Sequence, residues 1–373
     1  MKKANKGEWG EPYVALKLIG DGKLYIADEN GNKNIHEWLN IIDVIRNETL
    51  ERMVVYHLNE KTATVSIQLN YNEIAVFSVK DFLYMANKLK KEIITKTGVF
   101  SVSEEVSDFM DKVGFSTLKA KSIDKCDIFI TASDPRSSII RENIGFSIKT
   151  YFGEDPTLFN TATASALIYR LNNMNKEKMD TVNSLFDKRG KVSVLKRCET
   201  LLAYGTDPTF FGFPVAVRAK CVAFKENLDM IDPRLEDVFI CVLWRHFFLK
   251  ERLKDIPDVV NTIIRVNPCN LSRPEIKYPY MIKSFLYAAY CGMTASTLWD
   301  GSSQVKGGYI SVNSVGDIVA NYALESDSFK NYLYNNCYME YPGTSKGHGN
   351  YGFVYEEDGE FFFRLNFQIR IHR

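Results

Sequence analysis

Two strand-like segments within residues 119–153 constrain most strongly what this chain can fold into. A polar, proline-containing stretch separates them. Residues 126–131 and residues 144–150 are rich in isoleucine and phenylalanine. Short apolar runs of this kind, bounded by turn-forming residues, are typical of strands. We therefore expect two neighbouring strands joined by an irregular connection.

The polar residues of these two segments suggest a chemistry. Asp127 opens the first strand, and Ser147-Ile148-Lys149 closes the second. Side chains alternate along a strand, so Ser147 and Lys149 share one face while Ile148 points to the other. An acid facing a lysine on the next strand can hold a divalent cation beside a charge stabiliser, and phosphodiester hydrolysis needs both. An ordinary strand pair is the alternative, because single acids and lysines are common near strand ends.

Longer sequence blocks carry a resemblance to a known family. The motif GFSIK after the strand CDIFI resembles the core of the PD-(D/E)xK nucleases, in the subgroup in which serine replaces the middle acid (SxK). Five blocks resemble the HpaII family of type II restriction endonucleases: NKGEWGEPYVALKLIGDGKLYIADENGNK, KAKSIDKCDI, GFSIKTYFGEDPTLFN, TLWDGSSQVKGGYI and GEFFFRLNFQIRI. They lie between residues 5 and 371, so the resemblance covers essentially the whole chain.

The resemblance implies a mixed α/β (α+β) fold containing a PD-(D/E)xK nuclease core. We expect an N-terminal α/β segment over residues 1–98, the catalytic core over residues 99–188, and a DNA-recognition region over residues 189–373. That last region is predicted to be helical at first and β-rich towards its end. One compact unit sharing a single core is the alternative.

Apolar periodicity predicts the individual elements. Trp38, Ile41, Ile42 and Ile45 have helical spacing, and alternation around the turn at residues 59–62 predicts a hairpin. One predicted helix begins near residue 11. The other predicted helices cover residues 38–45, 80–96, 103–113, 163–171, 235–251 and 281–290. The further predicted strands cover residues 24–27, 53–58, 63–69, 308–313, 353–356 and 361–371.

The resemblance also implies roles for the candidate site residues. Asp127 would hold the metal, and Lys149 would stabilise the scissile phosphate or position water. Ser147 stands where most of the superfamily has an acid, and a hydroxyl is a poor cation ligand, so Ile148 is expected to offer its backbone carbonyl. Glu105, on the helix before the two strands, is our choice for the compensating acid.

Three other acids are alternatives to this choice. Glu142 lies closer in sequence, but alternation turns it away from the face of Ser147 unless a bulge intervenes. Glu154 and Asp155 follow the lysine strand, and the next helical segment offers no acid in its first turn.

Candidate DNA contacts follow the lysine strand and recur later in the chain. Thr157, Asn160 and Thr161 form a polar loop that could read base edges or bind phosphate, with simple turn and cap chemistry as the alternative. Residues 188–225 contain eight Lys/Arg against two Asp/Glu. That balance suits phosphate contacts, with Lys196 and Arg197 as candidates, although a solvated helical face has the same composition.

Guanine recognition requires donors that the loop after the lysine strand lacks. Arginine, lysine and, less often, glutamine read guanine edges in the major groove. Gln304 and Lys306 in the segment SSQVKGG are candidates, as is Lys346 in a glycine-rich loop.

Composition limits the remaining possibilities. The chain has 373 residues, 45% of them hydrophobic, and a net charge of +1 that gives no global attraction to nucleic acid. Its start lacks the apolar stretch of a signal peptide, and no apolar run reaches the length of a membrane span. The seven cysteines contain no C-x-x-C pair, which favours reduced thiols in a cytoplasmic protein over a disulfide framework or a zinc site.

We interpret the sequence as a Mg²⁺-dependent type II restriction endonuclease acting on double-stranded DNA. The resemblance implies the palindrome CCGG as target and a cytosine methyltransferase as genetic partner. A symmetric target favours a homodimer, and a monomer that reads the site asymmetrically is the alternative. The competing functions are a structure-specific or repair nuclease with the same core and a catalytically inactive DNA-binding module.

Overall fold

The chain divides into two compact units in the computed structural model. Unit 1 comprises Met1–Pro156 and Ser303–Tyr332, and unit 2 comprises Thr157–Ser302 and Leu333–His372. The structure describes residues 2–28, 31–119, 126–153, 155–186, 193–206, 208–212, 222–302, 307–322, 326–342 and 351–372. The chain passes between the two units after residues 156, 302 and 332. The boundaries expected near residues 98 and 188 stay predictions.

Unit 1 is built around a nine-stranded mixed sheet with the order β1-β12-β11-β7-β6-β2-β3-β4-β5. Because β1 also pairs with β2, the strands from β1 to β2 close into a six-membered ring, and β3, β4 and β5 extend from it. The strands are β1 (Lys23–Ala27), β2 (Lys33–Asn47), β3 (Met53–Asn59), β4 (Thr64–Leu69), β5 (Asn72–Ser78), β6 (Ile128–Ser133), β7 (Ile140–Thr150), β11 (Gly308–Val312) and β12 (Ile318–Tyr322).

Helix α1 (Lys6–Asp21) belongs to the core of unit 1. Asn5 caps it by accepting the Glu8 N–H at 3.0 Å, and the Glu8 carboxylate accepts the Asn5 N–H at 2.9 Å. The buried apolar side chains of α1 lie on most sides of the helix, which is typical of a helix enclosed by other elements. Its buried side chains include those of Trp9, Tyr13, Val14, Ala15, Leu16, Leu18 and Ile19.

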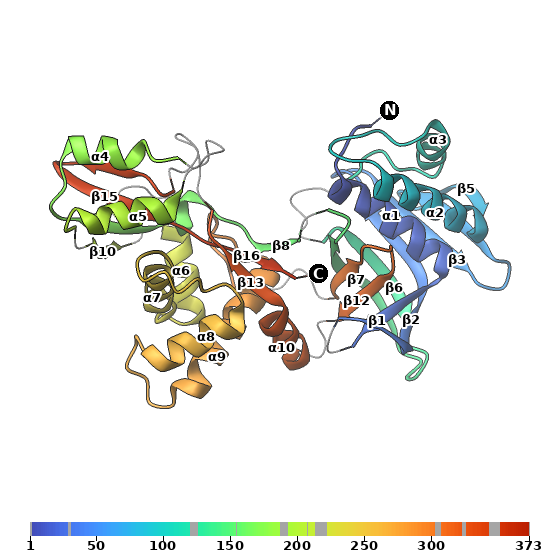
Figure 1. Ribbon diagram of the computed structural model, residues 1–373. Coiled ribbons are helices and arrows are strands. Elements are labelled where there is room, and N and C mark those ends of the chain that lie inside the picture. Colours follow the sequence, from blue (N-terminus) through green and yellow to red (C-terminus); the bar gives the residue numbers. More distant parts are fainter. Residues whose placement is uncertain are drawn as a thin grey trace. The chain divides into compact units, whose positions relative to one another are not determined.

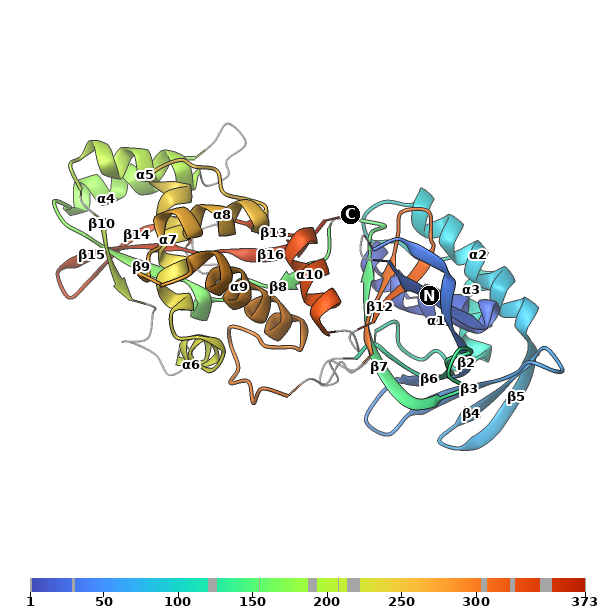
Figure 2. The same cartoon turned by 90° about the horizontal axis from the view of Figure 1, so that it is seen from below.

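Two more helices complete the apolar packing of unit 1. α2 (Val79–Thr95) runs beside α1 in both views of Figures 1 and 2. α3 (Glu104–Lys112) packs through Phe109 against Phe82 of α2 and Phe77 of β5, with ring centroids 5.4 and 5.7 Å apart. The first part of α10 (Ser326–Asn336) belongs to unit 1, and Phe329 packs on Tyr309 of β11.

Unit 2 is mainly helical and contains two small sheets, β10-β9-β15-β14 and β13-β16-β8. Its core is aromatic: the Phe239 and Phe367 rings stack with centroids 4.6 Å apart, and Phe159 and Phe285 pack beside them. Its elements are β8 (Thr157–Phe159), the 3₁₀ turn Thr163–Ser165, β9 (Leu167–Leu171), α4 (Lys176–Asn183), α5 (Val194–Ala203), β10 (Pro208–Gly212), α6 (Val222–Ile231), α7 (Leu235–Phe247), α8 (Ile256–Val266), α9 (Pro274–Tyr290), β13 (Cys337–Glu340), β14 (Val354–Glu357), β15 (Glu360–Leu365) and β16 (Gln368–Ile371).

Most predicted elements are present, including the hairpin β3–β4, the strand β6 that begins directly after Asp127, and the strand β7 that carries Lys149. The predicted helix over residues 38–45 is wrong, because this segment is the middle of β2. A register shift between Ile41 and Asp43 interrupts the strand alternation, so buried Ile41 is followed by buried Val44 at a helix-like interval.

The predicted helix over residues 163–171 is also wrong. Its second half is β9, which lies between β10 and β15 and is buried at four of its five positions. A strand buried on both faces has a continuous apolar run, which periodicity alone does not distinguish from a buried helix.

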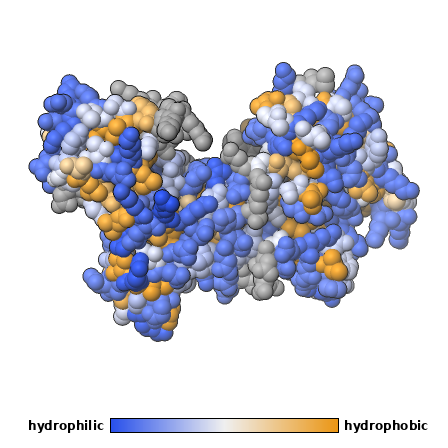
Figure 3. Space-filling model, viewed as in Figure 1, coloured by the Kyte–Doolittle hydropathy of each residue, from blue (hydrophilic) through white to orange (hydrophobic). Residues whose placement is uncertain are grey.

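Apolar side chains on the face in Figure 3 form small separate patches within a hydrophilic surface. Within the described ranges, no helix is long and apolar enough to span a membrane.

The close crossing of α1 and α2 gives a stability prediction. A Cβ added at Gly20 would lie 2.7 Å from the main-chain N and Cα of Leu83, whereas one added at Gly153 would have its nearest neighbour at 4.0 Å. Gly20→Ala should therefore lower the free energy of unfolding by about 1–3 kcal/mol, the usual cost of overpacking. Urea unfolding with Gly153→Ala as control tests this, and equal stability of the two variants would contradict a tight helix crossing.

Candidate active site

The candidate site lies where β6 begins beside the last residues of β7. Ile128 is paired with Phe146, and the Asp127 N–H donates to the Phe146 carbonyl at 2.9 Å. The ladder between the two strands ends there, while β7 runs on to Thr150. The end of β7 therefore projects past its neighbour.

The carboxylate of Asp127 occupies the place where a longer β6 would pair with β7. Its Oδ2 accepts the Ile148 N–H at 2.6 Å and the Ser147 hydroxyl at 3.2 Å. In an antiparallel pair the N–H and C=O of one residue point to the same edge, so the Ile148 carbonyl also faces this end of β6. The fold thus brings together three of the predicted residues: an acid, a hydroxyl and a main-chain carbonyl.

Lys149 lies on the same face of β7 as Ser147, as alternation predicted, and β11 continues this polar face. Parallel pairing sets Tyr309 beside Ser147 and Ser311 beside Lys149. On β12, Asn321 is paired with Tyr309 and donates its amide to the Ser311 hydroxyl at 3.2 Å. Ser311 and Asn321 are buried, so the polar row continues inside unit 1.

Sequence reasoning missed the three polar residues that β11 and β12 add. The sequence predicted a strand over residues 308–313 but not its partner in the sheet. Pairing with β7 is a contact across more than 150 residues of sequence, and no local pattern encodes it.

The opposite face of β7 fixes the strand to the core. Phe146 and Ile148 belong to the same buried apolar cluster as Trp9 and Tyr13 of α1. Where α1 crosses the strand, a Cβ at Gly10 would lie 2.2 Å from Cγ2 of Thr150. This close packing holds the end of β7, and with it the polar face, in a defined position.

The structure does not bring Glu105 beside Asp127. Glu105 is exposed on α3 and forms an ion pair with Lys88 of α2. Through Phe109, α3 packs on β5, which is four strands from β6 in the order of the sheet.

The alternative acids are not gathered at the site either. A bulge does intervene near Glu142, since the register shifts between Ile130 and Ala132 of β6, but Glu142 is exposed towards the other end of β7. Asp155 is half-buried beyond β7, and Glu154 lies outside the described residues. Among described residues, no group of three or more His, Cys, Asp or Glu could hold a metal ion.

The predicted DNA contacts fall in unit 2 or outside the described residues. Thr157 starts β8, and Asn160 and Thr161 follow that strand, with Asn160 exposed. Lys196 is exposed on α5. The remaining candidates, Gln304, Lys306 and Lys346, lie in segments that the structure does not describe.

Arg197 has a role inside the fold. It is fully buried, and its guanidinium donates to the carbonyls of Asn183 at 2.6 Å, Gly352 at 2.7 Å and Leu185 at 3.1 Å. It also stacks over the Phe353 ring at 4.0 Å, and burial lowers the pKa of Arg197 to about 10. In this position the guanidinium connects main-chain segments and is withdrawn from the surface on which a phosphate would bind.

The chain is similar to known proteins both as a family member and in its sequence. The model of the family described as HpaII restriction endonuclease matches residues 5–371. The chain is 30% identical over 371 residues to the type II restriction enzyme HpaII of Haemophilus parainfluenzae, covering 98% of each chain. No solved structure matches.

The contrast between two adjacent residues of α5 gives a prediction. Arg197→Ala should lower the free energy of unfolding by about 3 kcal/mol or more, because three carbonyls lose a charged donor and the packing over Phe353 is lost. Lys196→Ala is the matched control and should change stability by less than about 0.5 kcal/mol. Denaturant unfolding of both variants checks this, and a stable Arg197→Ala protein would show that the guanidinium contacts contribute little.

Proposed function

Because the chain belongs to the HpaII restriction endonuclease family, it is a type II site-specific endonuclease, and we propose that it hydrolyses double-stranded DNA at the palindrome CCGG. The observation that carries the proposed chemistry is the junction of β6 and β7. There Asp127 is held against Ser147 and Ile148, and Lys149 follows on the same face.

We propose that this junction is the centre of a PD-(D/E)xK core. In that assignment β6 supplies the first acid, β7 supplies the S-x-K motif, and α1 packs behind β7. The pairing of β6 with β7 and the hydrogen bonds of Asp127 support the assignment. The acid and the lysine then face the same side, where a scissile phosphate could approach both.

These residues fit a magnesium ion for which the protein supplies only some of the ligands. Mg²⁺ is often held by one or two carboxylates together with waters and substrate phosphate, without a complete protein cage. Asp127 offers one carboxylate, and the Ile148 carbonyl faces the same end of β6. Ser147 is committed to Asp127 as a donor, which suits support of the acid better than metal binding. The proposed ligands are therefore Asp127 and Ile148, completed by a DNA phosphate.

The proposed mechanism assigns each residue one task. Bound Mg²⁺ supplies Lewis-acid polarisation of the phosphate. The Lys149 ammonium donates to a non-bridging oxygen of the same phosphate and stabilises the charge that develops as water attacks phosphorus. The bond from phosphorus to the departing sugar oxygen breaks as the bond to water forms, and the proton that the water loses ends on that sugar oxygen. The Ser147 hydroxyl and the Ile148 N–H fix the Asp127 carboxylate, so that little reorganisation is needed during reaction.

We also propose the assignments for DNA and partners. Lys196 contacts phosphate, and Thr157, Asn160 and Thr161 contact the DNA backbone or base edges. Gln304, Lys306 and Lys346, outside the described residues, remain the proposed readers of guanine. The symmetry of a palindrome favours a homodimer, the genetic partner is a cytosine methyltransferase, and the enzyme works in the cytoplasm.

One observation favours a second candidate function, a DNA-binding module without catalysis. Among the described residues, no group of three or more His, Cys, Asp or Glu surrounds Asp127, and a lone carboxylate holds Mg²⁺ weakly. Incubation of unmethylated plasmid DNA with the protein and Mg²⁺, followed by sequencing of any cut ends, separates the possibilities. Ends confined to CCGG support the proposal, scattered ends indicate a structure-specific or repair nuclease, and intact but retarded DNA indicates the binding module.

The site assignment predicts a separation of binding from cleavage. Lys149→Ala and Asp127→Asn should each slow cleavage by about a hundredfold or more, because they remove charge at the reacting phosphate, while DNA affinity without divalent metal changes little. Glu142→Gln, an exposed acid on the same strand, is the control and should cleave normally. Near-normal cleavage by either site variant would remove that residue from the active site.

A further inference from the structure

Residues 113–119, which follow α3, are held in place mainly by side chains of other elements. Around the start of this stretch, the Tyr56 hydroxyl donates to the Val113 carbonyl at 2.9 Å, and Lys2 Nζ donates to the Phe115 carbonyl at 2.7 Å. At its far end, Lys119 forms an ion pair with Glu8 of α1 at 2.8 Å. We call residues 113–119 the connecting segment.

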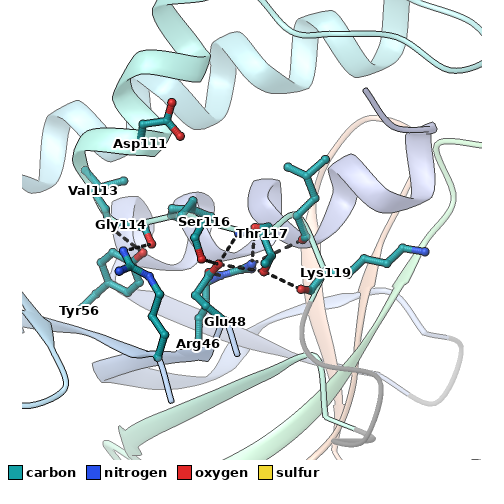
Figure 4. A network of polar contacts seen from close by, with 12 residues as sticks. Arg46, Glu48, Tyr56, Asp111, Val113, Gly114, Ser116, Thr117 and Lys119 are labelled. Atoms are coloured by element: carbon teal, nitrogen blue, oxygen red, sulfur yellow. Dashed lines mark hydrogen bonds and ion pairs between the residues drawn. The ribbon is translucent and has the colours of Figure 1, made fainter. Parts of the chain in front are cut away.

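A buried ion pair at the end of β2 binds the middle of this segment (Figure 4). Arg46 Nε donates to Glu48 Oε1 at 2.8 Å, and Arg46 Nη2 donates to the Thr117 carbonyl at 3.2 Å. Glu48 Oε2 accepts the N–H and the hydroxyl of Thr117 at 2.6 and 2.9 Å and the Ser116 hydroxyl at 3.0 Å. The Arg46 guanidinium also lies 4.5 Å over the Phe115 ring.

Stability alone does not account for this arrangement. The side chains of Arg46 and Glu48 are only 2% and 0% exposed, and Nη1 of Arg46 is buried with no hydrogen-bond partner. Burial works against ionisation of Glu48, but Arg46 and Thr117 outweigh it and lower the pKa of Glu48. Ionic pairs of this kind often contribute no more to stability than apolar residues of similar volume. What the pair adds is a fixed position for the connecting segment.

The position that is fixed lies beside the candidate site. β2 pairs with β6 with Ile45 opposite Phe129, so the next residues, Arg46 and Ile128, meet at the end of the ladder where Asp127 lies. Asp127 is thus bounded by β7 on one side and by the end of β2 on the other. We propose that Arg46 and Glu48 are positioning residues for DNA hydrolysis, which hold the end of β2 and the connecting segment beside Ile128 so that the neighbouring Asp127 meets the reacting phosphate. This inference rests on the proposed function.

The test replaces the ion pair with apolar side chains, in the variant Arg46→Met/Glu48→Leu. Ser116 and Thr117 are at least partly exposed, so water can replace the lost acceptor, and stability in urea should stay within about 1 kcal/mol of wild type. The single-turnover cleavage rate at saturating DNA should fall about tenfold or more, since a 1 Å misplacement can cost about a hundredfold. DNA affinity without divalent metal should not change, and hydrogen exchange at the amides of residues 115–119 should accelerate.

Two further variants make the outcome specific. Arg245→Met/Glu251→Leu removes a partly buried ion pair in unit 2 and should leave the cleavage rate unchanged. Thr117→Val keeps the ion pair but removes one hydroxyl bond to Glu48, so a several-fold slower rate with unchanged stability is expected. If the apolar double variant does not fold, the cleavage rate of Thr117→Val tests the positioning role in its place.

Wild-type cleavage rates in folded Arg46→Met/Glu48→Leu protein would overturn the proposal, as would an unchanged rate in Thr117→Val protein if the double variant does not fold. An equal rate loss in the Arg245 control would also overturn it, because the effect would then be general. Asp127→Asn, measured in parallel, separates this failure from failure of the proposed function. If that variant cleaves normally, the site itself is wrong; if it is inactive while the ion-pair variants are normal, only the positioning role is lost.

Discussion

The unequal reach of β6 and β7 is the constraint on which the candidate site depends. A main-chain N–H at the end of a ladder needs a partner, and at Ile148 that partner is the carboxylate of Asp127. The same contact that satisfies the strand also aims an acid at the face that carries Lys149. A main-chain hydrogen bond of the fold itself therefore orients the acid.

Burial on the opposite face gives this junction its rigidity. Phe146 and Ile148 are packed into a core shared with α1, so the two faces of β7 have separate tasks. One face is fixed by close apolar packing, and the other carries hydroxyl, ammonium and amide groups in register across β7, β11 and β12. Such a division suits a strand that must stay still while the half-buried Ser147 and Lys149 face a charged ligand.

The sequence predicted those features that depend on neighbouring residues, and it failed where the structure depends on contacts between distant residues. Ser147 and Lys149 share one face of β7 as expected, because alternation along a strand is a local property, whereas the contact of Asp127 with Ser147 depends on the pairing of two strands. The helix expected at Ile41 and Ile45 failed because a bulge imitates helical spacing, and the helix expected at Leu167 failed because a doubly buried strand has no alternation to detect. Composition also grouped Arg197 with Lys196, since only packing distinguishes a buried guanidinium from a surface ammonium.

The discontinuity of unit 1 has a consequence for the order of synthesis. The ring of strands closes only when β11 and β12 pair with β7 and β1, and those strands are translated after the greater part of unit 2. Until residues 308–322 leave the ribosome, β7 lacks the neighbour that supplies Ser311, and the nascent chain exposes a long unpaired edge beside Lys149. Contacts across such a sequence separation form late and slowly. A chain that stops early would therefore carry both site strands but not the closed ring that holds them.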